Sequence, residues 1–361
     1  MNGVAPSGRW DVWETIPRAM PWAIIVCPFR AKEEEGSGGI PINNPQKTGQ
    51  AEALPHHQKK NHPKKLHMAI RAILLLASIS VLLACSRKEQ PSPNPPSPAP
   101  ASTPAAGRPT ADSSSIERPD LGRYFQQVGA DSGAFVLHDL SANRVIRYNP
   151  ARCAKGFLPA STFKIFNALV ALETGVAPDT NFALPWDSVV RPIQNWNHDQ
   201  TIAEAFRNST VWFYQELARR IGQERMQMWV SREGYGNQNI HGGIDKFWLS
   251  GQLQISPDQQ VEFLRRLYEG KVGFSKRTTE LVKQIMLQRD TPHYRLRAKT
   301  GWGSVGKVQI GWIVGWVERS QGAAIFALNL ESRDPNYPMV KSRMEALQGI
   351  LKDLEIIPKQ E

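Results

Sequence analysis

The stretch LRAKTGWGSVGKVQIGWIVGWVERSQGAAIFALNL, residues 296–330, contains three consecutive segments with the character of β-strands. They cover residues 296–299, 307–317 and 323–330, and the second alternates between apolar and other residues. Glycine and serine lie between the segments, where turns are expected. Strands that follow one another through short turns pair in antiparallel fashion, so this stretch predicts an antiparallel sheet.

Two more strands are predicted near the other end of the domain, at residues 134–140 and 144–148, around a turn at 141–143. Helical periodicity dominates between the two sets of strands, as in residues 211–221 and 259–269, and a last helix covers 339–354. The fold class is therefore α/β (α+β). We expect an antiparallel sheet flanked by N- and C-terminal helices with an inserted all-helical subdomain, over residues 116–361.

The segment before this domain predicts a tether and an export signal. Residues 86–115 are rich in proline, serine and alanine, a composition that cannot bury a core. Residues 68–85 place Arg71 before an apolar run that is too short to span a bilayer. The run ends Leu82-Leu83-Ala84-Cys85, which resembles the lipobox of bacterial lipoproteins, in which the cysteine is lipidated.

This resemblance implies a protein anchored by lipid on Cys85 at the periplasmic face of a bacterial membrane. Ser86 after the cysteine favours the outer membrane, and without the anchor the protein would be periplasmic. We interpret residues 1–67 as a non-native upstream translation or a removed leader, because they show no sustained periodicity.

Charge and cysteine content exclude several functions. The net charge of +11 is spread without a basic tract or interleaved aromatic residues, which argues against nucleic acid and suits a small anionic substrate. No histidine or cysteine pair has metal-ligand spacing, so no metal is predicted. Cys153 has no second cysteine within the domain and is expected to be a buried structural thiol.

A candidate nucleophile begins the helical region. Ser161-Thr162-Phe163-Lys164 opens an apolar helical stretch, in which positions i and i+3 share a face, so Lys164 can reach the Ser161 hydroxyl. A neutral amine beside a serine can accept its proton, and a helix N-terminus favours a developing oxyanion. Ser304-Val305-Gly306-Lys307 has the same spacing but is predicted in a strand, where i and i+3 face apart, and it is rejected.

Two further motifs follow in order. Ser209-Thr210-Val211 lies just before a helix, and Lys299-Thr300-Gly301 ends a short strand before Trp302. On an edge strand, Lys299 and Thr300 offer a cation and a hydroxyl to a substrate carboxylate, and Gly301 lets the ligand approach the backbone. Lys47-Thr48-Gly49 has no strand around it and is discarded.

This order of motifs is the signature of penicillin-recognising serine enzymes. The chain resembles the class D, or oxacillinase-type, serine β-lactamases over residues 116–357. The matching blocks are residues 159–164, 209–215, Tyr235-Gly236-Asn237, Phe247-Trp248-Leu249 and Lys299-Thr300-Gly301. The resemblance implies hydrolysis of β-lactam antibiotics through an acyl-enzyme on Ser161, with no cofactor other than the CO₂ that carbamylates Lys164.

The resemblance also implies roles around Lys164. Its carbamate, an N6-carboxylysine, would be the general base for acylation and deacylation. Carbamylation needs an uncharged amine, and an apolar pocket formed by Phe163, Val211 and Leu249 would lower the lysine pKa. Trp248 would donate its indole N–H to the carbamate, since a buried indole needs a partner.

By the same resemblance, Ser209 relays protons, while Lys299 polarises that serine and attracts the substrate carboxylate. The backbone N–H groups of Ser161 and Trp302 form the oxyanion hole. Arg343 on the last helix matches the family's carboxylate-binding arginine, with Lys341 as a nearby competitor.

Class A β-lactamases are rejected. They use Glu-x-x-Leu-Asn, and residues 233–237 share its outer letters but lack the leucine, while Val211 stands where class A has asparagine. Two alternatives of another kind remain. A β-lactam-sensing or penicillin-binding protein would be acylated but turn over slowly, and a lipid-anchored protein with an inactive site is the second alternative. The preferred β-lactams, carbapenem hydrolysis and the oligomeric state are not encoded in any motif.

Overall fold

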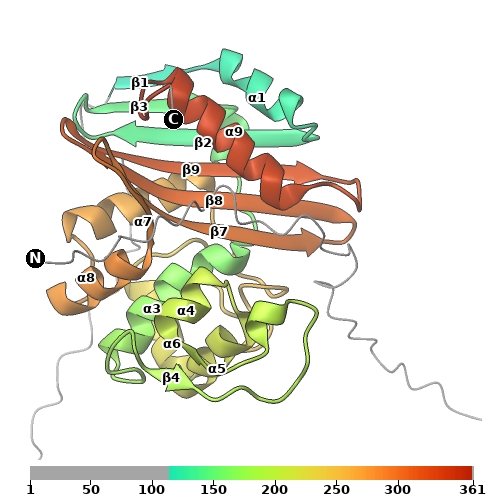
Figure 1. Cartoon of the computed structure of the whole chain (residues 1–361), viewed down its shortest axis with the longest axis vertical. Helices are drawn as coiled ribbons and strands as arrows, with labels where there is room; N and C mark the ends of the chain where they lie inside the picture. Colours follow the sequence, from blue (N-terminus) through green and yellow to red (C-terminus); the bar gives the residue numbers. More distant parts are fainter. Residues whose placement is uncertain (1–113, 360–361) are drawn as a thin grey trace, which may run out of the picture. The chain divides into compact units, whose positions relative to one another are not determined.

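The structure is a computed structural model that describes residues 114–359. A seven-stranded sheet runs through the middle, with the strand order β1-β3-β2-β9-β8-β7-β6 (Figure 1). The strands are β1 (Ser114–Glu117), β2 (Ser132–Asp139), β3 (Arg144–Tyr148), β6 (Leu287–Asp290), β7 (Arg295–Val305), β8 (Val308–Arg319) and β9 (Gly322–Ser332). All neighbours pair antiparallel except β1 and β3, which are parallel.

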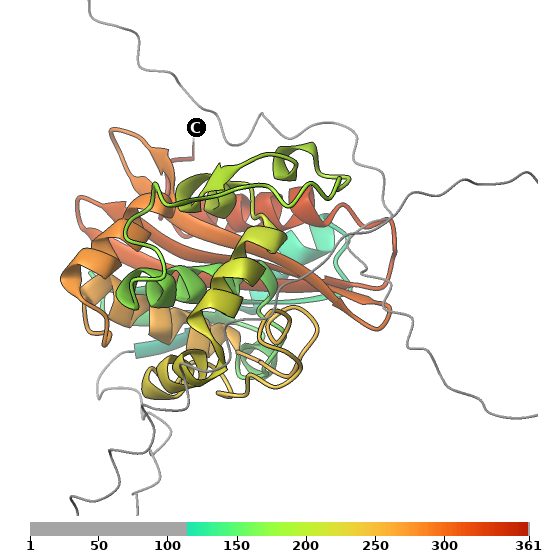
Figure 2. The same ribbon diagram turned by 90° about the horizontal axis from the view of Figure 1, so that it is seen from below.

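Helices cover both faces of the sheet. The helices α1 (Gly122–Gln127) and α9 (Met339–Asp353) lie on one face, and the remaining helices lie on the other (Figures 1 and 2). The latter are α2 (Pro150–Cys153), α3 (Lys164–Glu173), α4 (Ile202–Arg207), α5 (Val211–Ile221), α6 (Gln223–Arg232), α7 (Pro257–Glu269) and α8 (Lys276–Ile285). Three short 3₁₀ turns, Pro119–Leu121, Ala160–Phe163 and Gln194–Trp196, and a small pair of strands, β4 (Ala183–Leu184) and β5 (Gln200–Thr201), complete this part of the chain.

The central strands are buried on both faces because successive side chains point to opposite sides. In β9, Phe326 and Leu328 pack under α1 and α9, whereas Ile325 and Ala327 join the core on the helical side. A strand covered on both faces reads as a continuous apolar run. That is why residues 323–330 show so little polar alternation in the sequence.

The predicted fold class is confirmed: a largely antiparallel sheet carries terminal helices and an inserted helical part. Helix α5 and strand β3 have the predicted bounds. Strand β1 begins at Ser114, two residues before the expected start of the domain. Strand β7 continues to Val305, well past the predicted end at Lys299, because its whole length pairs with β8 in one hairpin.

The export-signal and anchor predictions, including Cys85, and residues 86–113 of the predicted tether lie outside the described residues, whereas Ser114 and Ser115 belong to β1. None of the helices within residues 114–359 is long and apolar enough to cross a bilayer.

Candidate active site

Ser161 lies in a tight turn rather than in regular helix. Residues Ala160–Phe163 form a 3₁₀ turn that leads directly into α3, which begins at Lys164. Ala160 has a φ of 49°, in the left-handed region that non-glycine residues rarely adopt. Its N–H donates to the carbonyl of Trp248 at 3.0 Å, which holds the strained residue in place. Strain of this kind is concentrated at functional sites.

Lys164 meets Ser161 as predicted. The Lys164 Nζ and the Ser161 Oγ are 2.8 Å apart in a hydrogen bond, and the lysine side chain is fully buried. Burial disfavours the charged ammonium and lowers the pKa of Lys164 to about 7. Much of the amine is therefore neutral near neutral pH, as a base or a CO₂ acceptor must be.

Aromatic side chains surround this lysine. Phe163 stacks on Trp248 with ring centroids 5.4 Å apart, and the Lys164 Nζ lies 5.3 Å from the ring centroid of Tyr214. Val211 shares a face of α5 with Tyr214, because the two are three residues apart, and it is half-buried. Leu249 is also half-buried and packs against the helical core. Tyr214 therefore lies against Lys164, while the contact of Val211 and Leu249 with this lysine stays a prediction.

The indole N–H of Trp248 is buried and has no hydrogen-bond partner among the described residues. The Tyr214 hydroxyl is likewise buried without a hydrogen-bond partner among the described residues, and burial raises its pKa well above the usual value. An unpaired buried donor costs free energy comparable to a lost hydrogen bond. Both donors therefore stay without an acceptor among the described residues, on side chains that contact Lys164 or its neighbour Phe163.

Ser209 and Lys299 form the second polar pair. The Lys299 Nζ donates to the Ser209 Oγ and to the Thr300 carbonyl, each at 3.0 Å. Burial lowers the pKa of Lys299 well below its usual value, and the charges of Lys164 and Arg343 lower it further. Ser209 has a φ of 55° just before α5, a second strained residue at the site.

Gly301 allows β7 to pass against the nucleophile turn. A Cβ at this position would lie 2.9 Å from the Pro159 carbonyl oxygen and 3.1 Å from the Thr162 Cγ2. Only a residue without a side chain fits such an approach. Through this approach, β7 lies against the Ala160–Phe163 turn that contains Ser161.

Arg343, not Lys341, reaches this strand from α9. The Arg343 Nη1 donates to the Gly301 carbonyl at 2.8 Å, and burial lowers the pKa of this guanidinium to about 10. Its Nε has no partner among the described residues. Lys341 is exposed and pairs with Glu345 at 3.5 Å, away from the site. The Trp302 indole donates to the Gln309 Oε1 at 2.9 Å, which fixes the ring next to Gly301.

The rejected motifs lie elsewhere. Ser304 and Lys307 are exposed at the tip of the β7–β8 hairpin, Lys307 in the turn rather than in the strand that was expected. Glu233 is buried and binds Arg266 and the N–H of Gly273, so it supports the fold. Lys47-Thr48-Gly49 lies outside the described residues.

Cys153 is buried, and its Sγ lies 3.1 Å from the Tyr148 carbonyl oxygen and 3.5 Å from the Phe135 carbonyl oxygen. Burial raises the pKa of its thiol to about 12, so it is not a nucleophile at neutral pH.

Sequence reasoning gave no separate role to three residues that support the site. Tyr214 lies against Lys164, and the Phe206 ring centroid is 5.5 Å from the Lys299 Nζ. Gln260 on α7 donates to the Thr162 Oγ1 at 2.9 Å and so holds the nucleophile turn. Tyr214 lies within the matching block of residues 209–215, which assigns it no role of its own. No local pattern points to Phe206 or Gln260, because their partners are distant in the chain.

Within residues 114–359 no group of three or more histidine, cysteine, aspartate or glutamate side chains is placed to hold a metal.

Known proteins are similar to this chain in sequence and fold. The family model of the penicillin-binding protein transpeptidase domain matches residues 107–352. β-Lactamase OXA-10 of Pseudomonas aeruginosa is 40% identical over 229 residues, which cover 62% of this chain and 86% of that protein. β-Lactamase OXA-48 of Klebsiella pneumoniae is 40% identical over 226 residues, 63% of this chain and 84% of that protein.

A solved structure of a class D β-lactamase, YbXI from Nostoc, is similar to this chain with a TM-score of 0.64 and 46% identity. The match covers 66% of this chain and 100% of that one. The predicted resemblance is confirmed by these matches. Ser161 is hydrogen-bonded to Lys164, and Ser209 to Lys299. The chain belongs to the class D β-lactamases, serine hydrolases of the penicillin-binding transpeptidase family.

Proposed function

We propose that this protein hydrolyses β-lactams through an acyl-enzyme on Ser161, with a carbamylated Lys164 as the general base. The single observation that carries the proposal is the 2.8 Å hydrogen bond between Ser161 and a fully buried lysine whose pKa is about 7. A lysine held neutral beside a serine can accept its proton or react with CO₂.

The surroundings of Lys164 fit a carboxylate group. Trp248 and Tyr214 each present a buried donor without a partner, and both lie against Lys164 or Phe163. Carboxylate oxygens accept such hydrogen bonds strongly in an apolar pocket. The carbamate, when present, supplies a base for both the serine and the deacylating water.

The other side chains bind and orient the substrate. Lys299 is bonded to Ser209, so the two can pass a proton toward the departing β-lactam nitrogen. Lys299 and Thr300 on β7 would hold the ring carboxylate together with Arg343 on α9, whose guanidinium reaches the Gly301 carbonyl of the same strand. The N–H groups of Ser161 and Trp302 would stabilise the oxyanion.

The carbamate is tested by adding ¹³C-bicarbonate to degassed protein and recording the carbamate carbon by NMR alongside the hydrolysis rate. Signal and rate should rise together with bicarbonate. Both should fall below about pH 7, because the protonated Lys164 amine cannot react with CO₂. Ser161→Ala should keep the signal and lose hydrolysis.

Trp248→Phe keeps a ring against Phe163 but removes the N–H, so it should need more bicarbonate and accumulate acyl-enzyme. Trp229→Phe is a matched control, because Trp229 also has a buried, unpartnered N–H and stacks on Phe274 instead. Hydrolysis that is independent of bicarbonate, with no carbamate signal, would mean that Lys164 acts as a plain amine. Acylation without turnover in the wild type would favour the slow penicillin-binding alternative.

We also propose that Cys85 is lipidated and anchors the enzyme at the periplasmic face of the outer membrane. Several buried acyl chains, at about 0.8 kcal/mol per CH₂, would hold it firmly. Fractionation of cells that express Cys85→Ala tests this, and an unchanged membrane fraction would contradict it.

A further inference from the structure

A cleft opens along β7 beyond the catalytic groups, where the neighbouring strand ends. Strand β6 pairs with β7 only as far as Arg297, and the Ala298 N–H then donates to the Met286 carbonyl at 2.9 Å. The cleft is small, with a volume of about 50 Å³, and it opens to solvent. Its lining comes from α4, β6, β7, β8 and α9 and comprises Phe206, Arg207, Gln288, Arg289, Leu296, Ala298, Lys299, Thr300, Ile313 and Met344.

The charged side chains of this lining are all basic. Arg207 and Arg289 contribute guanidinium groups, Lys299 contributes an amine, and the lining contains no carboxylate. The Arg343 guanidinium lies close enough to lower the pKa of Lys299 and adds a further positive charge nearby. A concave surface with charges of one sign attracts and orients ligands of the opposite sign.

Arg207 is exposed at the last residue of α4, and its guanidinium has no hydrogen bond or ion pair with another described residue. The charge of Arg207 contributes to lowering the pKa of Glu204, one turn earlier in the helix. The Glu204 carboxylate, however, accepts hydrogen bonds from the N–H and the hydroxyl of Thr201 at the start of the helix. Arg207 is therefore available to a ligand.

The cleft lies next to the place proposed for the ring carboxylate of a β-lactam. In the proposed function, on which this inference rests, the ring carboxylate lies against Thr300, Lys299 and Arg343. The cleft continues from Thr300 back along β7 to Ala298 and Leu296, away from Gly301 and the nucleophile turn. In a cephalosporin, the C3 substituent is attached to the ring atom next to the one that bears the carboxylate, so it would enter this cleft.

We infer that the cleft between α4, β6 and α9 is a subsite for an anionic substituent next to the ring carboxylate, with Arg207 as its specificity-determining residue. Cephalosporins whose C3 side chain carries a sulfonate or carboxylate are preferred over neutral analogues of the same shape. Because the Arg207 guanidinium is exposed to solvent, the preference for anionic substituents weakens as salt screens its charge.

Cefamandole and cefonicid test the inference, since they differ only in a methyl or sulfomethyl group on the C3 tetrazole. The ratio of their kcat/KM values, measured at low salt, should favour the sulfonate by roughly fivefold in the wild type, as expected for exposed charges. Arg207→Gln should bring the ratio close to one, and Arg207→Lys should retain part of the preference.

Lys307→Gln is the matched control. It also removes one exposed cation, but from the far end of the β7–β8 hairpin, roughly 20 Å along the strand from Lys299. It should leave the ratio as in the wild type. A wild-type ratio of one, or a ratio that Arg207→Gln does not change, overturns this inference alone. A wild type that hydrolyses neither compound overturns the proposed function as well.

Discussion

Lys164 shows at the scale of one residue how catalysis opposes stability. Its ammonium loses hydration in the fully buried site, and the pKa falls from 10.5 to about 7. Between these two pH values the unfolded chain binds a proton that the folded protein does not, so the unfolded state is favoured. The penalty is absent above about pH 10.5, grows as the pH falls, and is complete below about pH 7.

Lys164→Met should therefore stabilise the protein while abolishing hydrolysis, a trade-off common at active sites. The shift in pKa corresponds to at most about 5 kcal/mol at or below pH 7. The gain should shrink steadily toward pH 10.5. Urea unfolding in CO₂-free buffer at several pH values measures it, and Lys341→Met, at an exposed position, is the control. A gain that does not vary with pH would contradict the burial cost.

The same scale explains which site residues a motif can identify. The spacing of Ser161 and Lys164 together with the helical pattern after them was sufficient, because residues three apart share a face of a helical turn. Ser209 and Lys299 are 90 residues apart, and no local rule brings them to 3.0 Å. Before the structure, only the resemblance to a family predicted that Lys299 acts on Ser209.

Helix α7 illustrates the scale of a single element. Ser256 accepts from the Gln259 N–H at 3.1 Å, and the Gln259 side chain accepts from the Ser256 N–H at 2.9 Å, a capping box. Pro257 occupies the first turn, and Gly270 ends the helix with a φ of 70°. This helix carries Gln260, which holds Thr162 in the nucleophile turn.

Ser256→Ala should lower the free energy of unfolding by about 1 kcal/mol, because the N–H of Gln259 loses the hydroxyl of the buried Ser256 as its acceptor. Ser250→Ala, at an exposed loop position, should change it little. Denaturant unfolding of both variants against the wild type provides the measurement. Equal stability of Ser256→Ala and the wild type would show that the cap contributes nothing here.

Elements with strong local signals were predicted well, and those that depend on partners were not. Helix α5 begins at Val211 and ends at Ile221 as expected, because its apolar stripe has helical spacing. Strand β6 was not predicted, since its four residues are largely polar and become a strand only through pairing with β7. For the same reason, β7 extends to Val305.

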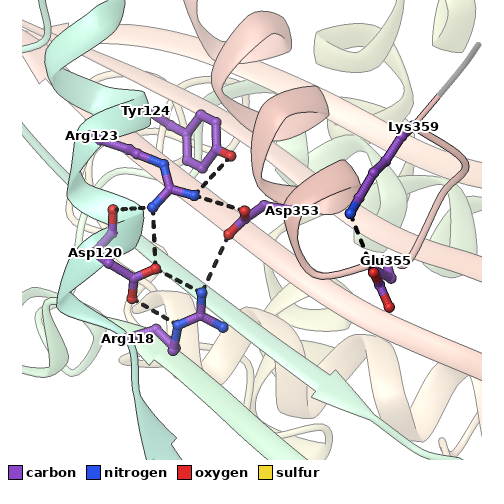
Figure 3. Close-up of polar contacts among 7 residues, drawn as sticks. All are labelled: Arg118, Asp120, Arg123, Tyr124, Asp353, Glu355 and Lys359. Atoms are coloured by element: carbon purple, nitrogen blue, oxygen red, sulfur yellow. Dashed lines mark hydrogen bonds and ion pairs between the residues drawn. The ribbon is translucent and has the colours of Figure 1, made fainter.

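At the scale of the whole molecule, an ion-pair network joins the two ends of the described chain. Asp353 at the end of α9 pairs with Arg123 at 2.7 Å and with Arg118 at 3.3 Å (Figure 3). Asp120 also pairs with both arginines, at 2.7 Å from Arg118 and 3.3 Å from Arg123. The network holds the segment before β2 against the last helix.

Asp353→Asn should lower the free energy of unfolding by at most about 1 kcal/mol, because these side chains are partly exposed. The loss should decrease in about 1 M salt, which screens surface pairs. Glu355→Gln is the control, since Glu355 pairs only with the exposed Lys359, at 3.3 Å (Figure 3). Thermal unfolding at low and high salt compares them. A loss that high salt leaves unchanged would rule out the ion pairs as its cause.

The sequence by itself determined the fold class, the elements with strong local periodicity such as α5 and β3, and the partnership of Ser161 with Lys164, because periodicity and short spacings are local properties. The tertiary structure decided what depends on distant segments meeting. It set the strand order with β1 parallel to β3, the burial that lowers the pKa of Lys164, and the contact between Lys299 and Ser209. It also placed Arg207 in a cleft with Lys299, since α4 and β7 meet only once the chain has folded.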